Sequence, residues 1–184
     1  MPFTFKKSSI PDVLIIEPKT YPDERGEFLE LFKQSIFEQN GINTKFVQDN
    51  ISVSKHGVLR GLHFQKPPKS QAKLISVLKG EIFDVAVDIR ENSPTYGQWI
   101  GEILSENNHK LLFIPEGFAH GFCTLRENTI VMYKVSNEYS SELERSIIWN
   151  DPEINISWPI KNPILSEKDS KATILKNVDN NFKF

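Results

Sequence analysis

Hydrophobic and polar positions alternate along much of the chain. In the clearest run, every second residue from Phe83 to Ile89 is apolar and faces one way, whereas Asp84 and Asp88 face the other. A period of two residues is the pattern of a half-buried β-strand. Segments of this kind recur between turns that contain proline or glycine. The predicted strands are 10–17, 27–32, 46–48, 50–54, 58–65, 74–78, 82–89, 99–104, 110–114, 121–125 and 129–135.

Helical patterns are few and short. Residues 33–40 predict a helix that Gly41 ends, and residues 166–172 predict one helical turn, whereas residues 21–26 predict a turn closed by glycine. Many short strands at hairpin spacing with little helix are typical of an antiparallel sandwich or barrel. The chain contains no repeat and no low-complexity segment. We therefore expect a single domain over residues 1–184, with a polar tail at about 177–184.

Composition and charge narrow the classes of function. The 184 residues are 39% hydrophobic and 25% charged, as in soluble globular domains. The net charge of −2 offers no basic surface for nucleic acid or an anionic membrane. Cys123 is the only cysteine, which excludes an intrachain disulfide and favours a cytoplasmic location. The N-terminus lacks an apolar signal region, and no segment approaches the ~18 apolar residues of a membrane span.

The histidines are the first candidates for chemistry. A metal-binding cupin needs two histidines one residue apart, then a carboxylate and a later histidine, so that the ligands converge on one ion. Here Gln65, a poor ligand, occupies the second position after His63, although His120 lies in a suitable turn-to-strand setting. His56 and His109 complete the set of histidines. The sequence therefore predicts no metal and no other cofactor.

Without a metal, a histidine at a barrel mouth is a proton-transfer group, because its reference pKa of about 6.5 suits a base near neutral pH. His63 then needs an orienting carboxylate, for which Asp84, Asp88 and Asp169 are all candidates. A structural histidine in the core is the alternative reading. Tyr133 likewise either packs in the core with its hydroxyl bonded or acts as an acid opposite the histidine.

Two carboxylates and several basic residues can also be explained by structural roles that involve no ligand. Glu144 and Asp169 each stand three residues after a serine, which is the spacing of a helix capping box. Basic residues usually form a solvated face, but Arg60 and Lys73 are less ordinary because each flanks the strand that carries His63. The basic residues considered are Arg25, Arg60, Lys73 and Lys168.

A series of motifs in fixed order resembles one known family. The most specific are GVLRGLH at residues 57–63 and PEGFAHGF at residues 115–122. With the other motifs, the chain is similar to the dTDP-4-dehydrorhamnose 3,5-epimerases over about residues 8 to 172. The other motifs are DERG at 23–26, QDN at 48–50, DVAVD at 84–88, SPT at 93–95, WNDP at 149–152 and LSEKD at 165–169.

The resemblance implies a fold and a set of site residues. The fold is a cupin-type jelly-roll barrel of antiparallel strands, acting as a homodimer without metal. His63 is implied as the general base, paired with Asp169, and Tyr133 as the general acid from the opposite face. Lys73 is implied to lie near the enolate oxygen. The residues implied to bind the nucleotide sugar are Arg25, Phe28, Glu30, Gln48, Asp49, Asn50, Arg60, His120, Tyr139 (stacked on the base), Glu144 and Lys168.

The implied reaction is the epimerisation of dTDP-4-dehydro-6-deoxy-D-glucose at C3 and C5 to dTDP-4-dehydro-L-rhamnose, a step of dTDP-L-rhamnose biosynthesis. A ketone at C4 acidifies the hydrogens at both carbons, and inversion requires reprotonation from the face opposite to the base. Three alternatives stay open. The first is a single-site epimerase or ketoisomerase on a related nucleotide sugar, the second is a metal cupin oxygenase, and the third is a sugar-binding module without activity.

Overall fold

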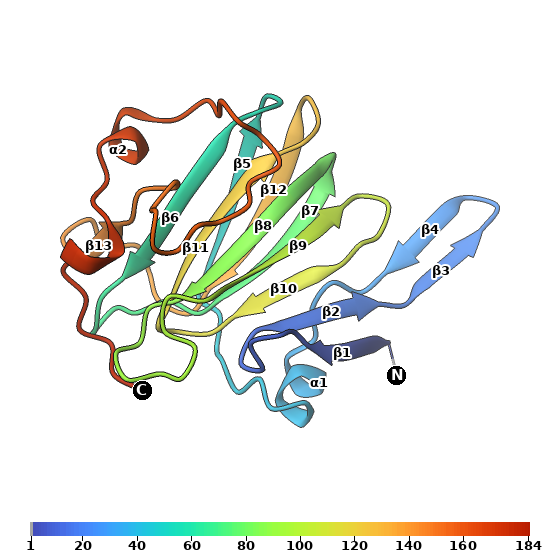
Figure 1. Ribbon diagram of the computed structural model, residues 1–184. Helices are drawn as coiled ribbons and strands as arrows, with labels where there is room; N and C mark the ends of the chain where they lie inside the picture. Colours follow the sequence, from blue (N-terminus) through green and yellow to red (C-terminus); the bar gives the residue numbers. More distant parts are fainter. Residues whose placement is uncertain (1) are drawn as a thin grey trace.

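Two antiparallel sheets face each other and enclose the main core (Figure 1). The structure is a computed structural model that describes residues 2–184. The first sheet consists, in spatial order, of β1 (Phe3–Lys7), β2 (Leu14–Pro18), β10 (Leu111–Ile114), β7 (Lys73–Lys79), β12 (Thr129–Val135) and β5 (Gln48–Ser54). The second consists of β13 (Glu144–Ser146), β6 (Leu59–Gln65), β11 (Phe118–Thr124), β8 (Glu81–Asp88) and β9 (Trp99–Ser105). The predicted barrel of antiparallel strands is confirmed.

The alternation in the sequence explains why both faces of the five-stranded sheet are buried. On β8, Ile82 and Ala86 face the six-stranded sheet and belong to the core between the sheets. Val85 and Val87 face the other way, against the segment 147–182 that covers the outer face of the sheet (Figure 1). Because Asp84 shares its side of the strand with Ile82 and Ala86, it points into the barrel.

The helices are short, as predicted, and lie at the margins of the sheets. They are α1 (Gln34–Gln39), α2 (Glu167–Ser170) and the 3-10 helix η1 (Leu175–Asn177). Phe37 anchors α1 to the outside of the six-stranded sheet, where its ring meets those of Phe3 and Phe32 edge to face at 5.3 and 4.8 Å. Gly41 follows the helix with a φ of 86°, as expected for a glycine that ends a helix.

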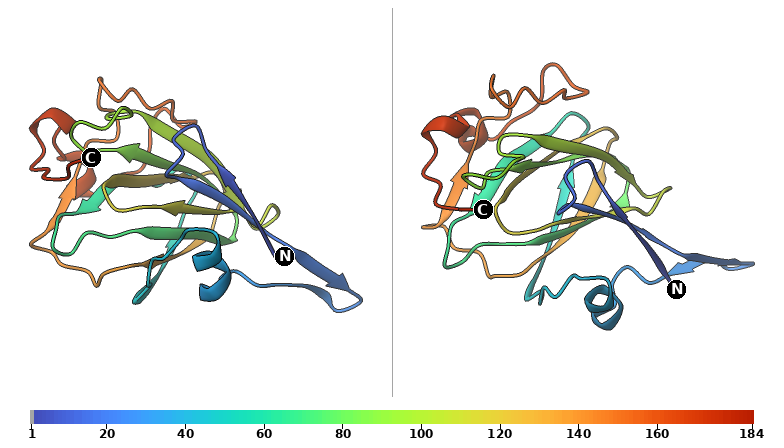
Figure 2. Two further views of the ribbon diagram at one scale, coloured as in Figure 1. Left: turned by 90° about the horizontal axis from the view of Figure 1, so that it is seen from below. Right: turned by 60° about the horizontal axis from the view of Figure 1, so that its bottom comes forward.

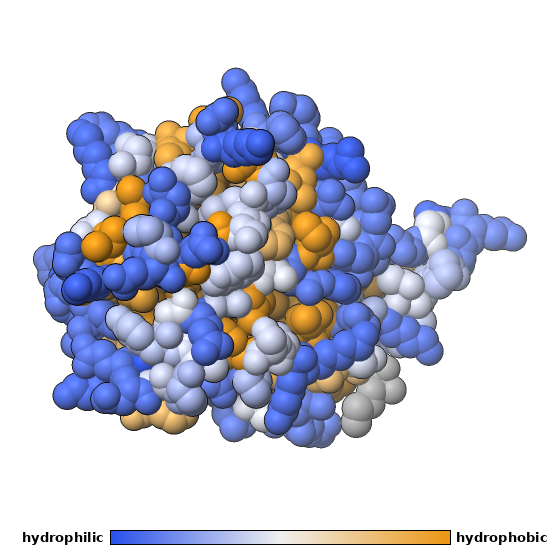
Figure 3. Space-filling model, in the orientation of Figure 1, coloured by the Kyte–Doolittle hydropathy of each residue, from blue (hydrophilic) through white to orange (hydrophobic). Residues whose placement is uncertain are grey.

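A hairpin of β3 (Thr20–Asp23) and β4 (Gly26–Leu29) projects from the body of the molecule (Figures 1 and 2). The turn predicted for residues 21–26 is therefore wrong in extent, since its first residues form β3. The strand predicted for residues 27–32 ends at Leu29, because Leu31 and Phe32 pack on the apolar cluster around α1 instead. Figure 3 shows mostly hydrophilic side chains on this projecting hairpin.

Other boundaries also differ from the prediction. The strand predicted from Ile10 begins at Leu14, since Ile10 lies in the preceding turn, and β11 begins three residues earlier than predicted. Strands β1 and β13 were not predicted, and both lie at sheet edges. None of the helices in residues 2–184 has the length and apolarity needed to cross a bilayer.

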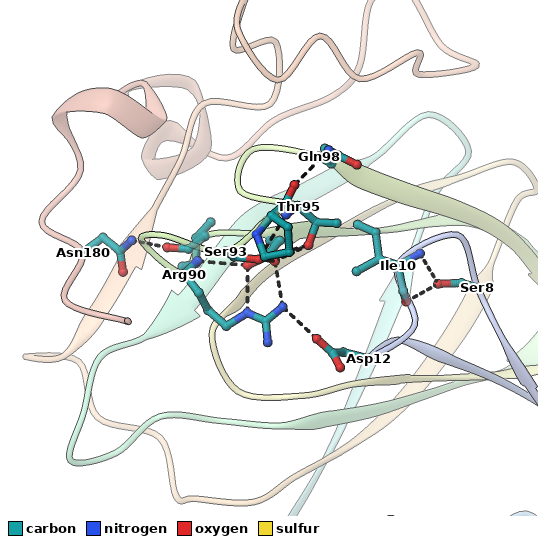
Figure 4. Close-up of polar contacts among 11 residues, drawn as sticks. Ser8, Ile10, Asp12, Arg90, Ser93, Thr95, Gln98 and Asn180 are labelled. Carbon is teal, nitrogen blue, oxygen red and sulfur yellow. Dashed lines mark hydrogen bonds and ion pairs between the residues drawn. The ribbon is translucent and has the colours of Figure 1, made fainter. Parts of the chain in front are cut away.

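The C-terminal segment, which its composition predicts to be a polar tail, packs against the body of the molecule. Phe182 packs on the outer apolar cluster, and the Phe184 ring lies against the guanidinium of Arg90, which also stacks on Phe118. The same guanidinium is bonded to the carboxylate of Asp88 and to that of Asp12, and Figure 4 shows the bond to Asp12. Arg90 therefore joins β8, the β1–β2 connection and the C-terminus at one corner.

Candidate active site

A cavity of about 320 Å³ opens between the two sheets at one end of the barrel. Both sheets and the segment after β13 contribute polar side chains to it, whereas the core deeper between the sheets is apolar. A pocket that combines apolar walls with convergent titratable groups is the expected form of a small-molecule site. Its lining includes Gln48, Asn50, Arg60, His63, Gln65, Gln71, Lys73, His120, Phe122, Tyr133, Tyr139, Glu144, Ser166, Lys168 and Asp169.

His63 lies on β6 and is paired with Asp169 on α2. The distance between His63 Nε2 and Asp169 Oδ1 is 2.6 Å, and the carboxylate is almost fully buried. Of the three carboxylates considered from the sequence, the structure thus brings Asp169 to this histidine. Asp88 is bonded to Arg90 instead, and Asp84 to His120.

Asp169 is held in place by the cap of its own helix. Ser166 is the N-cap of α2, where its Oγ accepts from the Asp169 backbone N–H at 3.0 Å and donates to the carboxylate at 2.8 Å. Burial alone would raise the pKa of Asp169, but the bonds from His63 and Ser166 and the charge of Lys168 outweigh it, so the pKa is lowered. Ser166 therefore caps the helix, and Asp169 pairs with His63 while it accepts from the capping hydroxyl, whereas Glu144 begins β13 and lies on no helix.

A second histidine–carboxylate pair lies beside the first. His120 on β11 is directly opposite His63 on β6, and its Nε2 atom lies 2.6 Å from Asp84 Oδ1. Asp84 is completely buried, and no hydrogen bond to its Oδ2 atom is seen within residues 2–184. Burial raises the pKa of Asp84 despite the neighbouring imidazole. No sequence pattern links Asp84 to His120.

A β-bulge brings Arg60 to the same side of β6 as His63. Regular alternation would place residues three apart on opposite faces, but on the partner strand the two opposing residues, Phe122 and His120, are only two apart. Two glycines allow this geometry, because a Cβ on Gly61 would lie 2.6 Å from the Cα of Gly121. The glycines of the two specific motifs therefore meet at the bulge that aims Arg60 into the pocket.

Tyr133 and Lys73 come from the opposite wall, the six-stranded sheet. Burial raises the pKa of the Tyr133 hydroxyl, with a smaller opposing effect of Arg60, so the group is protonated at neutral pH. Lys73 is buried, with 6% of its surface exposed, and burial lowers the pKa of its ammonium to about 8 even though Glu144 and Glu116 oppose this. No hydrogen bond to its Nζ is seen within the described residues, so the ammonium is available to a ligand.

The mouth of the cavity is formed by side chains that hold one another. The Tyr139 hydroxyl donates to Glu144 at 2.8 Å, and Glu144 also forms an ion pair with Lys168. Gln48 accepts from the Tyr139 backbone N–H at 3.0 Å and donates to Asn50. Burial would raise the pKa of Glu144, but Lys168 and Tyr139 lower it. These predicted binding residues therefore all lie at one opening.

Four residues predicted to bind substrate lie outside this cavity. Asp49 is exposed and pairs with Lys134 at 2.9 Å, because its neighbours Gln48 and Asn50 take the inward positions of β5. The other three, Arg25, Phe28 and Glu30, lie on or just after the projecting hairpin, away from the pocket of their own chain.

Some lining residues were missed in the sequence. Gln71 and Phe122 line the cavity, and each stands two residues from a predicted site residue, Lys73 or His120. Strand period was therefore the signal that could have found Phe122, which lies on β11, whereas Gln71 precedes β7 and no strand pattern marks it. The spacing predicts Ser166 only as a helix cap, but the residue also lines the cavity and donates to Asp169.

The family model of dTDP-4-dehydrorhamnose 3,5-epimerase matches residues 7–177. The chain belongs to this family. A dTDP-4-dehydrorhamnose 3,5-epimerase from Shigella flexneri is 56% identical over 89% of this chain and 91% of its own length. The predictions of the family and of an isomerase are therefore confirmed.

Solved structures extend the comparison to the fold. A dTDP-6-deoxy-D-glucose-3,5-epimerase from Legionella pneumophila, in complex with dTDP-4-keto-L-rhamnose, superposes with a TM-score of 0.93 at 49% identity, covering 96% of this chain and 95% of that one. A 3'-monoepimerase from Streptomyces bikiniensis, in complex with dTDP-quinovose, gives 0.87 at 31% identity, covering 92% and 87%. The cupin-type jelly roll is thus confirmed, and epimerases of one and of two carbons share it.

Proposed function

We propose that this chain inverts C3 and C5 of dTDP-4-dehydro-6-deoxy-D-glucose to give dTDP-4-dehydro-L-rhamnose, a step of dTDP-L-rhamnose biosynthesis. The observation that carries the proposal is the pair of opposed walls of one pocket. A histidine paired with a carboxylate lies on one sheet, and a protonated tyrosine lies on the other. Relatives that are about half identical to the chain carry this activity in their names, which supports the same choice of substrate.

His63 acts as the base that removes the proton next to the C4 ketone. Asp169 orients the ring and stabilises the imidazolium that forms, because an ionised carboxylate lies 2.6 Å from Nε2. The lowered pKa of Asp169 keeps it ionised at neutral pH. The other ring nitrogen, Nδ1, is left to meet the substrate. The base then takes the proton from C3 or C5, whichever the sugar ring presents.

Lys73 stabilises the charge that develops on the C4 oxygen. A cation in a pocket from which water is excluded stabilises an enolate far more than it would in bulk water. With a pKa of about 8, the ammonium is mostly charged at neutral pH. Its burial, with no hydrogen-bond partner among the described residues, leaves its donors directed to the ligand.

Tyr133 returns a proton to the carbon from the opposite side. A single base can only give back the proton to the face from which it came, so inversion needs a second group on the other wall. The raised pKa of Tyr133 keeps this donor protonated. Arg60, His120 and Lys168 supply donors for the sugar and diphosphate oxygens. Tyr139 stacks on the base at the opening.

The working unit is a homodimer in which the hairpin reaches the pocket of a second copy. Arg25 and Phe28 are exposed on a hairpin that projects from the body and cannot serve the pocket of their own chain. Strand β5 is an edge strand and pairs only with β12 within the described residues, so its other edge is open to a second copy. Ile51 and Val53 on this strand are exposed and form an apolar strip on its outer face. Ile51→Asp should convert a dimer of the 21.2 kDa chain to monomers in light scattering.

The remaining expectations are a single domain over residues 1–184, a cytoplasmic location and a mechanism without metal. Cys123 is a buried thiol, and burial raises its pKa to about 11, which suits a structural cysteine of a reducing compartment. Elemental analysis of the purified active protein should find less than stoichiometric zinc, iron, nickel or manganese.

Proton NMR of the substrate with the protein in D₂O tests the proposed function. Deuterium at both C3 and C5, with the L-rhamno configuration in the product, is expected. Deuterium at one carbon only would show that the protein is a single-site epimerase. The Streptomyces bikiniensis monoepimerase has the same fold, so the fold allows this outcome. No deuterium at either carbon would contradict the proposal.

A further inference from the structure

Gln65 is a buried polar residue that the proposed mechanism does not use. It ends β6, two residues after His63, and only 2% of its surface is exposed. Its amide could coordinate a metal only weakly, so its chemistry here must be that of a hydrogen-bonding group. The contacts of its side chain therefore indicate its role.

Every polar atom of this side chain is bonded to backbone. The amide nitrogen donates to the carbonyl oxygens of Lys69 at 2.6 Å and Glu138 at 3.2 Å. The amide oxygen accepts from the backbone N–H of Ser140 at 2.7 Å. A glutamine has two donor hydrogens and one acceptor oxygen, so these three bonds occupy both donors and the oxygen.

Two of the three bonds enclose Tyr139. Gln65 holds the carbonyl before this residue and the N–H after it, while Gln48 from the opposite sheet accepts from the N–H of Tyr139 itself. Gln65 also pairs across strands with Glu144, whose carboxylate accepts from the Tyr139 hydroxyl. Tyr139 is 58% exposed, so packing does little to fix its side chain.

We propose that Gln65 is the positioning residue that holds Tyr139 at the mouth of the pocket, where its ring receives the nucleobase. The inference rests on the proposed function through the stacking role of Tyr139. An exposed ring on a loop loses conformational freedom when a base stacks on it, and a loop already held by buried hydrogen bonds loses less. Gln65 thus lowers the dissociation constant of the nucleotide without touching the reacting carbons.

The test is a double-mutant cycle on the binding of dTDP by calorimetry, with Gln65→Met, Tyr139→Ala and the double variant. Stacking on an aromatic side chain is worth enough that Tyr139→Ala should weaken dTDP binding about tenfold. Gln65→Met should weaken it about five- to tenfold. The double variant should bind within about twofold of Tyr139→Ala alone, because the two residues act as a unit.

Kinetics add a measurement that a general loss of structure would not reproduce. KM of Gln65→Met should rise about as much as the dissociation constant of dTDP, while kcat stays within about threefold of the wild type. Gln34→Met is the matched control, since Gln34 also donates to a loop carbonyl, that of Thr44, but lies outside the pocket. Gln34→Met should leave both constants unchanged.

If Gln65→Met does not fold, Gln65→Glu takes its place in the double-mutant cycle. The carboxylate keeps the shape and can still accept from Ser140 N–H, but it cannot donate to the two carbonyls. Additive losses, or a Gln65 variant that binds dTDP like the wild type, would overturn the role of Gln65 while leaving the stacking of Tyr139 intact. If Tyr139→Ala itself binds dTDP normally, the stacking role and the inference from it are both wrong.

Discussion

The two walls of the pocket prepare their catalytic groups by opposite means. On the five-stranded sheet each histidine is paired with a buried carboxylate at 2.6 Å, His63 with Asp169 and His120 with Asp84. On the six-stranded sheet no side-chain hydrogen-bond partner of Lys73 or Tyr133 is seen within residues 2–184, and burial is the largest cause of their pKa shifts, downward for the lysine and upward for the tyrosine. Pairing orients a base, whereas burial holds an acid protonated and leaves a cation for the substrate.

This difference between the walls predicts what is lost when a residue of each wall is substituted. Removing a paired group leaves a buried partner without its bond, which costs activity and also stability. Removing a group that is only buried costs activity, and for a charged group it relieves the cost of burial. The following variants separate these cases.

His63→Ala should have the largest effect. Loss of the base should lower kcat at least about 10³-fold, since general base catalysis contributes up to about 10⁴. Deuterium exchange at C3 and C5 should vanish together, while dTDP binding stays near that of the wild type. His56→Ala, at an exposed histidine outside the pocket, is the matched control. Residual exchange at either carbon would show that another group removes its proton.

Lys73→Met should lower kcat by about 10²-fold, because a single oxyanion-stabilising donor contributes this much in other enzymes. The wild-type kcat/KM should also fall as the pH rises through about 8, where the ammonium loses its proton. Lys73→Arg, which stays charged, should not show this fall. If kcat/KM of Lys73→Arg falls with rising pH as in the wild type, the fall is caused by a group other than Lys73.

The same Lys73→Met substitution should stabilise the fold at pH 7. The folded-state pKa of about 8 is lower than the unfolded value of 10.5, so the protonated lysine destabilises the native state fully below pH 8. The gain is on the order of 3 kcal/mol, as an upper limit, and it should shrink as the pH rises from 8 to 10.5. Urea unfolding at several pH values measures it, with Lys79→Met on the exposed end of β7 as control.

Ser166→Ala should have the smallest effect. It removes the cap of a four-residue helix and one bond to the Asp169 carboxylate. A lost cap costs about 1 kcal/mol, and we expect kcat to fall only severalfold because His63 still holds Asp169. Urea unfolding and steady-state kinetics measure the two effects. A loss of kcat as large as that of His63→Ala would show that the cap, rather than the histidine, positions the carboxylate.

The sequence was enough to predict the fold class and to identify the two specific motifs. It did not predict how the residues of the two motifs are arranged around the pocket. Strand period assigned most strands, yet it would have placed Arg60 and His63 on opposite faces, because a bulge leaves no sign in hydrophobic alternation. Without the family resemblance, composition and spacing could not favour Asp169 over Asp84 as the partner of His63, since the pairs that form join residues 106 and 36 positions apart. The polar composition of the C-terminus likewise concealed the packing of Phe182 and Phe184.

Tyr133→Phe in D₂O measures most directly whether the two walls act on opposite faces of the sugar. The variant keeps His63 and Lys73, so the enolate still forms and should return its deuteron to the face from which the proton came. Proton NMR should therefore show deuterium at C3 and C5 in a sugar that keeps its original configuration, with inversion lowered about 10²-fold. Tyr96→Phe, at a half-exposed tyrosine outside the pocket, should behave like the wild type. Equal loss of exchange and inversion in Tyr133→Phe would contradict an acid on the second wall.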